Sequence, residues 1–149
     1  MRKSARGMLD SNRINRRTID AAVDGLPKGF STGNLVAGLT LGFWVHLSDR
    51  SREAVIWRSG LYRAWPKGTN RAELQERLYG ILRVRNRVAH NERLFDPKRP
   101  ELSPKKVDTD AIELLGILCP EATDYLYGEG GAPIGKFLNE HPAPVAVEL

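Results

Sequence analysis

Apolar residues recur at helical spacing along most of the chain, and no segment alternates between apolar and polar residues as a half-exposed strand would. The clearest period lies between residues 70 and 90. There Asn70 and Glu73, three residues apart, are typical of a helix start. The pattern predicts an all-α protein whose best-defined helix carries one apolar stripe, formed by Leu74, Leu78, Ile81, Leu82, Val88 and Ala89.

Turn-forming residues divide the rest of the chain into four further predicted helices, of which the first is a basic candidate at residues 1–24. Residues 35–47, capped by Ser31 or Thr32, are apolar nearly all round and should be buried on more than one side. A helix at 53–65 ends at a Pro-Lys-Gly turn, and residues 96–107 should form an exposed connection. Asp108 or Thr109 should begin a helix that Pro120 kinks or divides, and in which Ile112, Leu115, Leu118, Cys119, Tyr125 and Leu126 can face inward.

We therefore expect about five helices with antiparallel neighbours in a single domain over residues 1–149. Its parts would be a basic N-terminal arm or helix (1–28), a core bundle (30–127) and a C-terminal segment and tail (128–149). The hydrophobic fraction of 41% argues against wholesale disorder, and no apolar run approaches the roughly 20 residues of a membrane span.

The single cysteine, Cys119, lies in an apolar run and should be a small buried residue. It can form no internal disulfide, and the basic start is not followed by an apolar region of the secretory kind. We expect a cytoplasmic protein. Lysine and arginine exceed aspartate and glutamate by 23 − 18 = +5, which is compatible with a phosphate-bearing partner.

Familiar catalytic and cofactor motifs are missing, and so are the paired cysteines of a zinc site. We expect neither a metal nor a cofactor. Two of the three histidines should be structural or exposed, since His46 lies in an apolar segment and His141 precedes a proline in the tail. The candidate chemistry is therefore concentrated in the basic segment at residues 83–90.

Arg85 is unusual in that segment, because about 100° per residue places it within the apolar stripe. A charge buried there would need a partner or a wet groove. Asn86 and His90 are four residues apart, so the Asn86 amide could orient the imidazole. Arg85 and His90 point roughly 140° apart on a straight helix. They would converge only if the helix ends before His90 or if a second copy contributes across a two-fold axis, which predicts a homodimer for a catalytic site.

The chemistry open to these side chains is narrow. Without a metal, a histidine can transfer protons and an arginine can stabilise a phosphorane-like state through two hydrogen bonds. RNA supplies its own nucleophile, the 2′-hydroxyl, whereas DNA lacks it. The natural reaction is RNA cleavage that leaves a 2′,3′-cyclic phosphate and a 5′-hydroxyl.

The segment Arg85-Asn86-Arg87-Val88-Ala89-His90 resembles the Arg-x(4–6)-His signature of HEPN-domain ribonucleases. Residues 30–95 resemble the Abi-like (abortive infection) branch of that superfamily. The two most recognisable blocks are Leu39-Thr40-Leu41-Gly42-Phe43-Trp44 and the stretch at residues 82–92.

That resemblance implies a HEPN-like bundle that forms a two-fold homodimer. It also implies a metal-independent, toxin-like endoribonuclease of phage defence, with an antitoxin protein as an expected partner. Arg85 and His90 would be the catalytic pair and Asn86 a supporting residue. The neighbouring cations expected to contact RNA are Arg83, Arg87 and Arg93.

Two alternatives stay open. The same bundle could be a non-catalytic module that binds RNA, a nucleotide or a partner protein. Alternatively, Arg85 could belong to a salt-bridge network with Glu92 or Glu113 that only stabilises the bundle.

Overall fold

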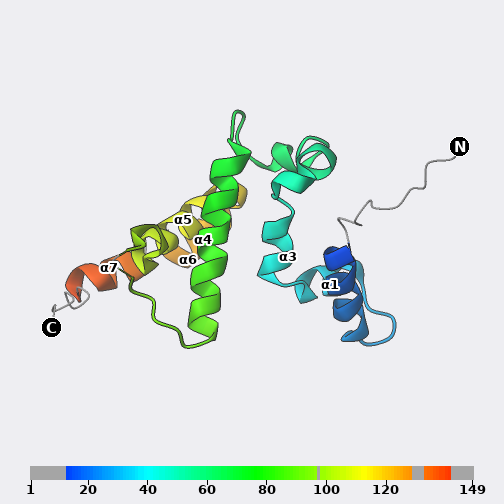
Figure 1. Ribbon diagram of the computed structural model, residues 1–149, viewed down its shortest axis with the longest axis horizontal. Helices are drawn as coiled ribbons and strands as arrows, with labels where there is room; N and C mark the ends of the chain where they lie inside the picture. Colours follow the sequence, from blue (N-terminus) through cyan, green and yellow to red (C-terminus); the bar gives the residue numbers. More distant parts are fainter. Residues whose placement is uncertain (1–12, 97, 129–132, 142–149) are drawn as a thin grey trace, which may run out of the picture. The chain divides into compact units, whose positions relative to one another are not determined.

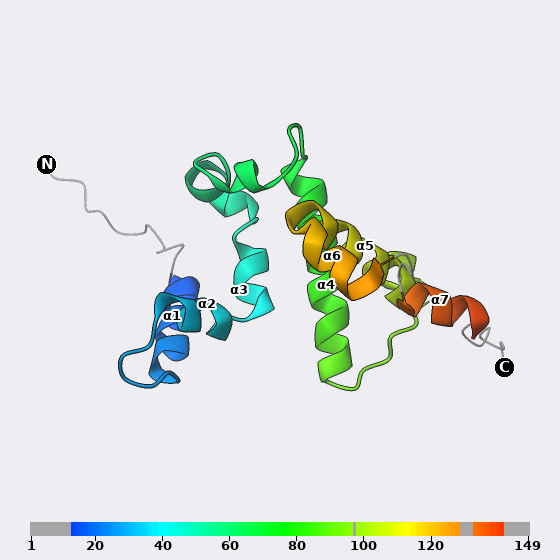
Figure 2. The same cartoon turned by 180° about the vertical axis from the view of Figure 1, so that it is seen from behind.

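The computed structural model describes residues 13–96, 98–128 and 133–141, and all regular secondary structure in these ranges is helical (Figures 1 and 2). The all-α prediction is confirmed. Parts of the predicted arm, the glycine-rich break and the tail lie outside these ranges. The chain forms two compact units, Met1–Leu47 and Ser48–Leu149. The expected single domain stays a prediction. No helix in the described part of the chain combines the length and apolar character that a membrane span requires.

The first unit contains three short α-helices: α1 (Arg13–Asp24), α2 (Thr32–Gly38) and α3 (Leu41–His46). The predicted Ser31 cap is confirmed, and Ser31 and Asn34 form a reciprocal capping box. The prediction of one helix over residues 35–47 is wrong. Leu39 is extended, and the Thr40 hydroxyl accepts a hydrogen bond from the Phe43 amide at 3.3 Å. This cap starts a new helix instead of continuing the old one.

The prediction that this apolar segment is enclosed on several sides is also wrong. Within α2 and α3 only Val45 is buried, while the side chain of Trp44 is 40% exposed and that of Val36 is 47% exposed. The break at Leu39 distributes the apolar surface over two short helices. Neighbouring elements then leave part of that surface uncovered.

In the second unit, three short non-α helices lie between residues 50 and 64, and two of them replace the α-helix predicted at 53–65. The three are η1 (Arg50–Arg52, a 3-10 helix), η2 (Glu53–Trp57, a π-helix) and η3 (Leu61–Ala64, a 3-10 helix). The Ser59 hydroxyl donates to the carbonyl oxygens of Val55 at 2.6 Å and Ile56 at 3.1 Å. Gly60 then departs from helical geometry, with φ −169° and ψ −38°. A hydroxyl that competes for these carbonyls, followed by a non-helical glycine, prevents regular α-helical bonding.

Helix α4 (Arg71–Ala89) is the long helix that the pattern predicts. The Asn70 side chain caps it by accepting from the Ala72 amide at 2.9 Å, and Asn70 donates to Glu73 at 2.9 Å. At the other end Asn91 has a positive φ of 53°. The amides of Asn91 and Glu92 donate to the carbonyls of Val88 (3.2 Å) and Arg87 (2.8 Å), which is the Schellman termination.

The second unit has two small cores. One contains Trp57, Leu74 and Leu114, and the other contains Val84, Leu102 and Val107. Both join α4 to α5 (Pro104–Leu118), and α6 (Pro120–Tyr127) and α7 (Pro133–Glu140) pack on α5 as well. The prediction that Pro120 divides the fifth helix is confirmed.

The predicted exposed connection at 96–107 is wrong in its second half. It contains η4 (Pro100–Leu102), the buried Leu102 and the first turn of α5. Ser103 caps α5 and Pro104 occupies its first turn, a favourable combination that starts the helix earlier than Asp108. Asp108 does cap a helix, but a different one: its Oδ2 accepts from the amides of Ile134 (3.2 Å) and Gly135 (3.4 Å) of α7.

The predicted core face is partly wrong at two places. Val88, at the end of α4, is 56% exposed and Ala89 is exposed, because α4 continues beyond α5 (Figures 1 and 2). On α6, Tyr125 is 89% exposed. Cys119 is half-buried instead of buried. Other predicted inward residues that are exposed are Leu118 and Leu126.

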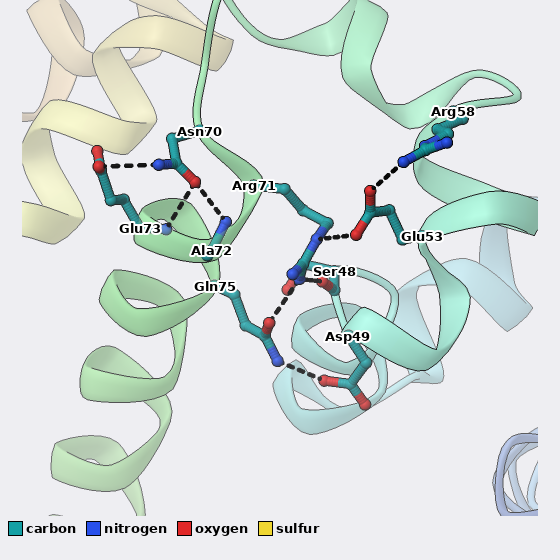
Figure 3. Close-up of polar contacts among 9 residues, drawn as sticks. All are labelled: Ser48, Asp49, Glu53, Arg58, Asn70, Arg71, Ala72, Glu73 and Gln75. Atoms are coloured by element: carbon teal, nitrogen blue, oxygen red, sulfur yellow. Dashed lines mark hydrogen bonds and ion pairs between the residues drawn. The ribbon is translucent and has the colours of Figure 1, made fainter.

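A polar network fastens residues 48–53 to the first half of α4 (Figure 3). Arg71 donates from Nη1 to the Ser48 carbonyl at 2.7 Å and from Nε to Glu53 at 3.2 Å. Gln75 donates to Asp49 Oδ1 at 3.0 Å. Because the partners are far apart in sequence, this network orients the η1–η2 segment against α4.

Candidate functional site

The candidate residues lie where α4 ends. Arg83, Arg85, Asn86 and His90 are all exposed, and so is Arg93 just beyond the helix. Thus the structure presents these polar side chains to solvent at one end of the second unit. The Schellman termination and the Asn70 cap define the two ends of the helix that carries them.

Arg85 is not the buried charge that the stripe predicted. Its side chain is exposed because the covered face of α4 at this level is that of Val84, which packs with Leu102 and Val107. The Arg85 Nη1 donates to the Asn86 side-chain oxygen at 3.2 Å. The salt-bridge alternative is wrong as well: Glu92 pairs with Arg87 at 3.7 Å, and Glu113 pairs with Arg77. Arg85 is therefore a solvent-facing cation held by a neighbouring amide.

His90 is the C-cap of α4 and lies outside its regular turns, with φ −103° and ψ 11°. By the prediction from sequence, Arg85 and His90 could converge in two ways, through an end of the helix before His90 or through a second copy. The first condition is met, because the α-helix ends at Ala89. The His90 amide still makes the helical bond to the Asn86 carbonyl at 3.0 Å, so the imidazole leaves the backbone close to the helical direction. The contribution of a second copy stays a prediction.

Asn86 does not orient the His90 ring in the way we predicted. The bond between these residues joins the His90 amide to the Asn86 carbonyl oxygen at 3.0 Å. The Asn86 side-chain oxygen instead accepts from Arg85. Asn86 thus positions the guanidinium directly and the histidine only through the backbone.

The three predicted RNA-contacting arginines differ in accessibility. Arg87 is only 25% exposed at its side chain, and its Nη1 is buried without a hydrogen-bond partner among the described residues. Arg93 is exposed. Arg83 lines a groove of about 320 Å³ between α4 and α5. The groove is also lined by Lys106 and by acidic residues, so it carries charges of both signs. Arg83 and Arg93 can meet a phosphate from solvent, whereas Arg87 is engaged at the helix end.

The arrangement can bring an imidazole and several guanidinium groups to an RNA backbone from an open surface. Among the described residues no group of three or more histidine, cysteine, aspartate or glutamate side chains could hold a metal ion. Sequence reasoning missed the Arg85–Asn86 bond, because residues adjacent in a helix are not neighbours on one face and such pairs are seldom expected.

Comparison with protein-family models, with curated proteins and with solved structures finds no match for this chain.

Proposed function

We propose that this chain is a metal-independent endoribonuclease of the HEPN type, with Arg85 and His90 as its catalytic pair. One observation carries the proposal: the Arg85 guanidinium, fixed by Asn86, is exposed at the same helix end whose cap residue is His90. The basic balance of the chain and the exposed Arg83 and Arg93 favour an anionic substrate.

In the proposed reaction the 2′-oxygen of RNA attacks the adjacent phosphorus while the bond from phosphorus to the 5′-oxygen breaks. A base removes the 2′-hydroxyl proton and an acid protonates the leaving 5′-oxygen. Arg85 would neutralise charge on the non-bridging oxygens. The products are a 2′,3′-cyclic phosphate and a 5′-hydroxyl.

The count of proton transfers supports a homodimer. The reaction needs two transfers, and each chain offers one histidine at this helix end. A two-fold dimer that brings two His90 side chains to one phosphate would provide both the base and the acid. Within this proposal the protein acts as a toxin-like effector of phage defence in the cytoplasm, where an antitoxin protein restrains it.

A non-catalytic RNA-binding module is the second candidate. The observation that favours it is the Asn86 side chain, which is bonded to Arg85 instead of supporting the His90 imidazole. An arginine held by an amide is suited to contacting phosphate, whether or not a proton is transferred.

The test is cleavage of end-labelled RNA in EDTA by the purified protein and by Arg85→Ala and His90→Ala. We expect each substitution to slow cleavage by at least about 100-fold, the usual effect of removing a general acid–base group. Matched controls are Arg99→Ala and His141→Ala, which remove an exposed arginine and an exposed histidine elsewhere in the second unit.

The products and the assembly separate the remaining possibilities. A 2′-deoxy substitution at the cleaved position should abolish cleavage, and sedimentation should report a dimer. Cleavage that survives both substitutions at the site would overturn this assignment. RNA binding without cleavage in the unmodified protein would instead establish the non-catalytic module.

A further inference from the structure

A second basic surface lies at the opposite end of α4, in a groove of about 480 Å³ that the turns before the helix enclose. Its lining contains three aromatic side chains and three cations and no carboxylate. The aromatic residues are Trp57, Tyr62 and Trp65, and the cations are Arg58, Arg63 and Lys67.

The two tryptophans form a fixed floor. Trp57 is buried together with Leu74 and Leu114, and Trp65 packs against the same cluster. Tyr62 differs, because the residue is 46% exposed and supplies the most accessible aromatic side chain of the groove. The Arg63 guanidinium lies over one face of the Tyr62 ring, 5.7 Å from its centroid, and its Nε donates to the Tyr62 hydroxyl at 3.4 Å, so a base would stack on the other face. Thus one flat apolar surface is presented next to a cation.

Lys67 is held at the rim by a tight turn. The Thr69 amide donates to the Pro66 carbonyl at 3.1 Å, and Gly68 has a φ of +90°, which fits the third position of a type II turn. Lys67 occupies the second position, where its side chain is exposed. The turn therefore projects an ammonium group beside the aromatic floor.

Arg58 can exchange its partner at low cost. Its side chain is 72% exposed and donates to Glu53 at 2.9 Å, a surface ion pair of the kind that contributes little to stability. This bond is the main reason that the pKa of Glu53 lies below its ordinary value, so the carboxylate is charged at neutral pH. Glu53 also accepts from Arg71, and it keeps that partner if Arg58 turns toward a ligand.

We propose that this groove binds single-stranded nucleic acid, with a base stacked on Tyr62 and the adjacent phosphates contacted by Arg58, Arg63 and Lys67. An exposed aromatic face surrounded by cations recognises a base and its phosphates together. A rigid duplex hides its base faces, and a lipid headgroup or an acidic peptide offers charge without a planar base. Of these ligands, only single-stranded nucleic acid can both stack a base on the aromatic side chain and place phosphates against the cations.

This inference does not require catalysis at His90. Helix α4 has 19 residues, so at about 1.5 Å per residue its two ends lie about 27 Å apart. A nucleic-acid strand bound both at His90 and in this groove of the same chain must run along α4. The groove would then hold nucleotides that are remote from the cleaved bond. Failure of cleavage and failure of binding in this groove are thus separate results.

The test is fluorescence-anisotropy titration of labelled single-stranded oligouridylate, made as RNA and as DNA, in a His90→Ala background that removes the proposed cleavage. Tyr62→Ala should weaken binding roughly 5- to 150-fold, the range that corresponds to about 1–3 kcal/mol of stacking on one base. Tyr62→Phe should restore binding to within about twofold, since it keeps the ring. Tyr125→Ala is the control, because it removes an exposed tyrosine from α6, outside the groove.

The cations are tested by salt dependence. Lys67→Ala should lower the slope of log K against log salt concentration by about 0.7, the value for one phosphate of a single strand. Lys98→Ala, which removes an exposed lysine elsewhere, should leave the slope unchanged. Competitors are a duplex of the same sequence, phosphatidylserine vesicles and polyglutamate. Unchanged affinity in Tyr62→Ala, or equal competition by any of these three, would overturn the proposal.

Discussion

The hydroxyl of Tyr79 donates a hydrogen bond to Oδ1 of Asp49 at 2.9 Å, across a sequence separation of 30 residues. Burial, followed by this hydrogen bond and the charge of the carboxylate, raises the pKa of Tyr79 to about 12 from an ordinary value of 10.0. Gln75 donates to the same carboxylate oxygen. The pair therefore joins the segment before η1 to the middle of α4. This hydrogen bond exists only while the Tyr79 phenol keeps its proton, because the proton is what it donates.

The stability of the second unit should consequently fall at alkaline pH. Between about pH 10 and 12 the unfolded chain releases the Tyr79 proton while the folded chain retains it, so the unfolded state binds fewer protons and folding loses stability as pH rises. Tyr79→Phe should be less stable at neutral pH and lose less stability over that interval. Denaturant unfolding at several pH values measures both effects.

The exposed Tyr125 supplies the control for this titration. Tyr125→Phe should leave the alkaline loss of stability unchanged, because Tyr125 is 89% exposed. An alkaline profile of Tyr79→Phe identical to that of the unmodified protein would show that another group is responsible.

Asn91 should tolerate glycine but not alanine. Its φ of 53° lies in the left-handed region at the end of α4, where a Cβ atom is unfavourable and asparagine is better tolerated than most residues. Asn91→Ala should lower the free energy of unfolding by about 1 kcal/mol. Asn91→Gly should be within a few tenths of a kcal/mol of the unmodified protein. Equal stability of the two variants would contradict the Schellman termination.

The corrected core face can be tested by truncation along α4. Leu74→Ala should cost about 2–5 kcal/mol, because Leu74 is 4% exposed and packs with Trp57 and Leu114. Val88→Ala, at a position that is 56% exposed, should change the free energy of unfolding by no more than about 0.5 kcal/mol. Urea unfolding at low protein concentration makes the comparison.

The Val88 variant also bears on assembly. If the exposed end of α4 forms the seam of the proposed homodimer, Val88→Ala should weaken dimerisation while leaving the stability of the dilute chain unchanged. A large loss of stability in the dilute chain would instead return Val88 to the core and reject the face that the structure shows.

The helical class, the long helix α4, its Asn70 cap and the division at Pro120 follow from the sequence, because each depends on local chemistry. Periodicity, a side chain that accepts amide protons and a ring that cannot continue a helix all act within a few residues. The end of α4 near His90 agrees with the helical period of the sequence, which stops near residue 90.

Only the tertiary structure decided which face of each helix is covered and which charges find partners. Arg85 lies on the stripe by periodicity, yet it is exposed because α4 turns Val84 and not Arg85 toward α5, and no local pattern encodes where a neighbouring helix packs. Asp108 caps α7 instead of its own helix, and Tyr79 meets Asp49, because contacts between distant residues form only when the elements pack. Local interactions determined the elements, and the non-local burial of side chains determined what each element presents to solvent.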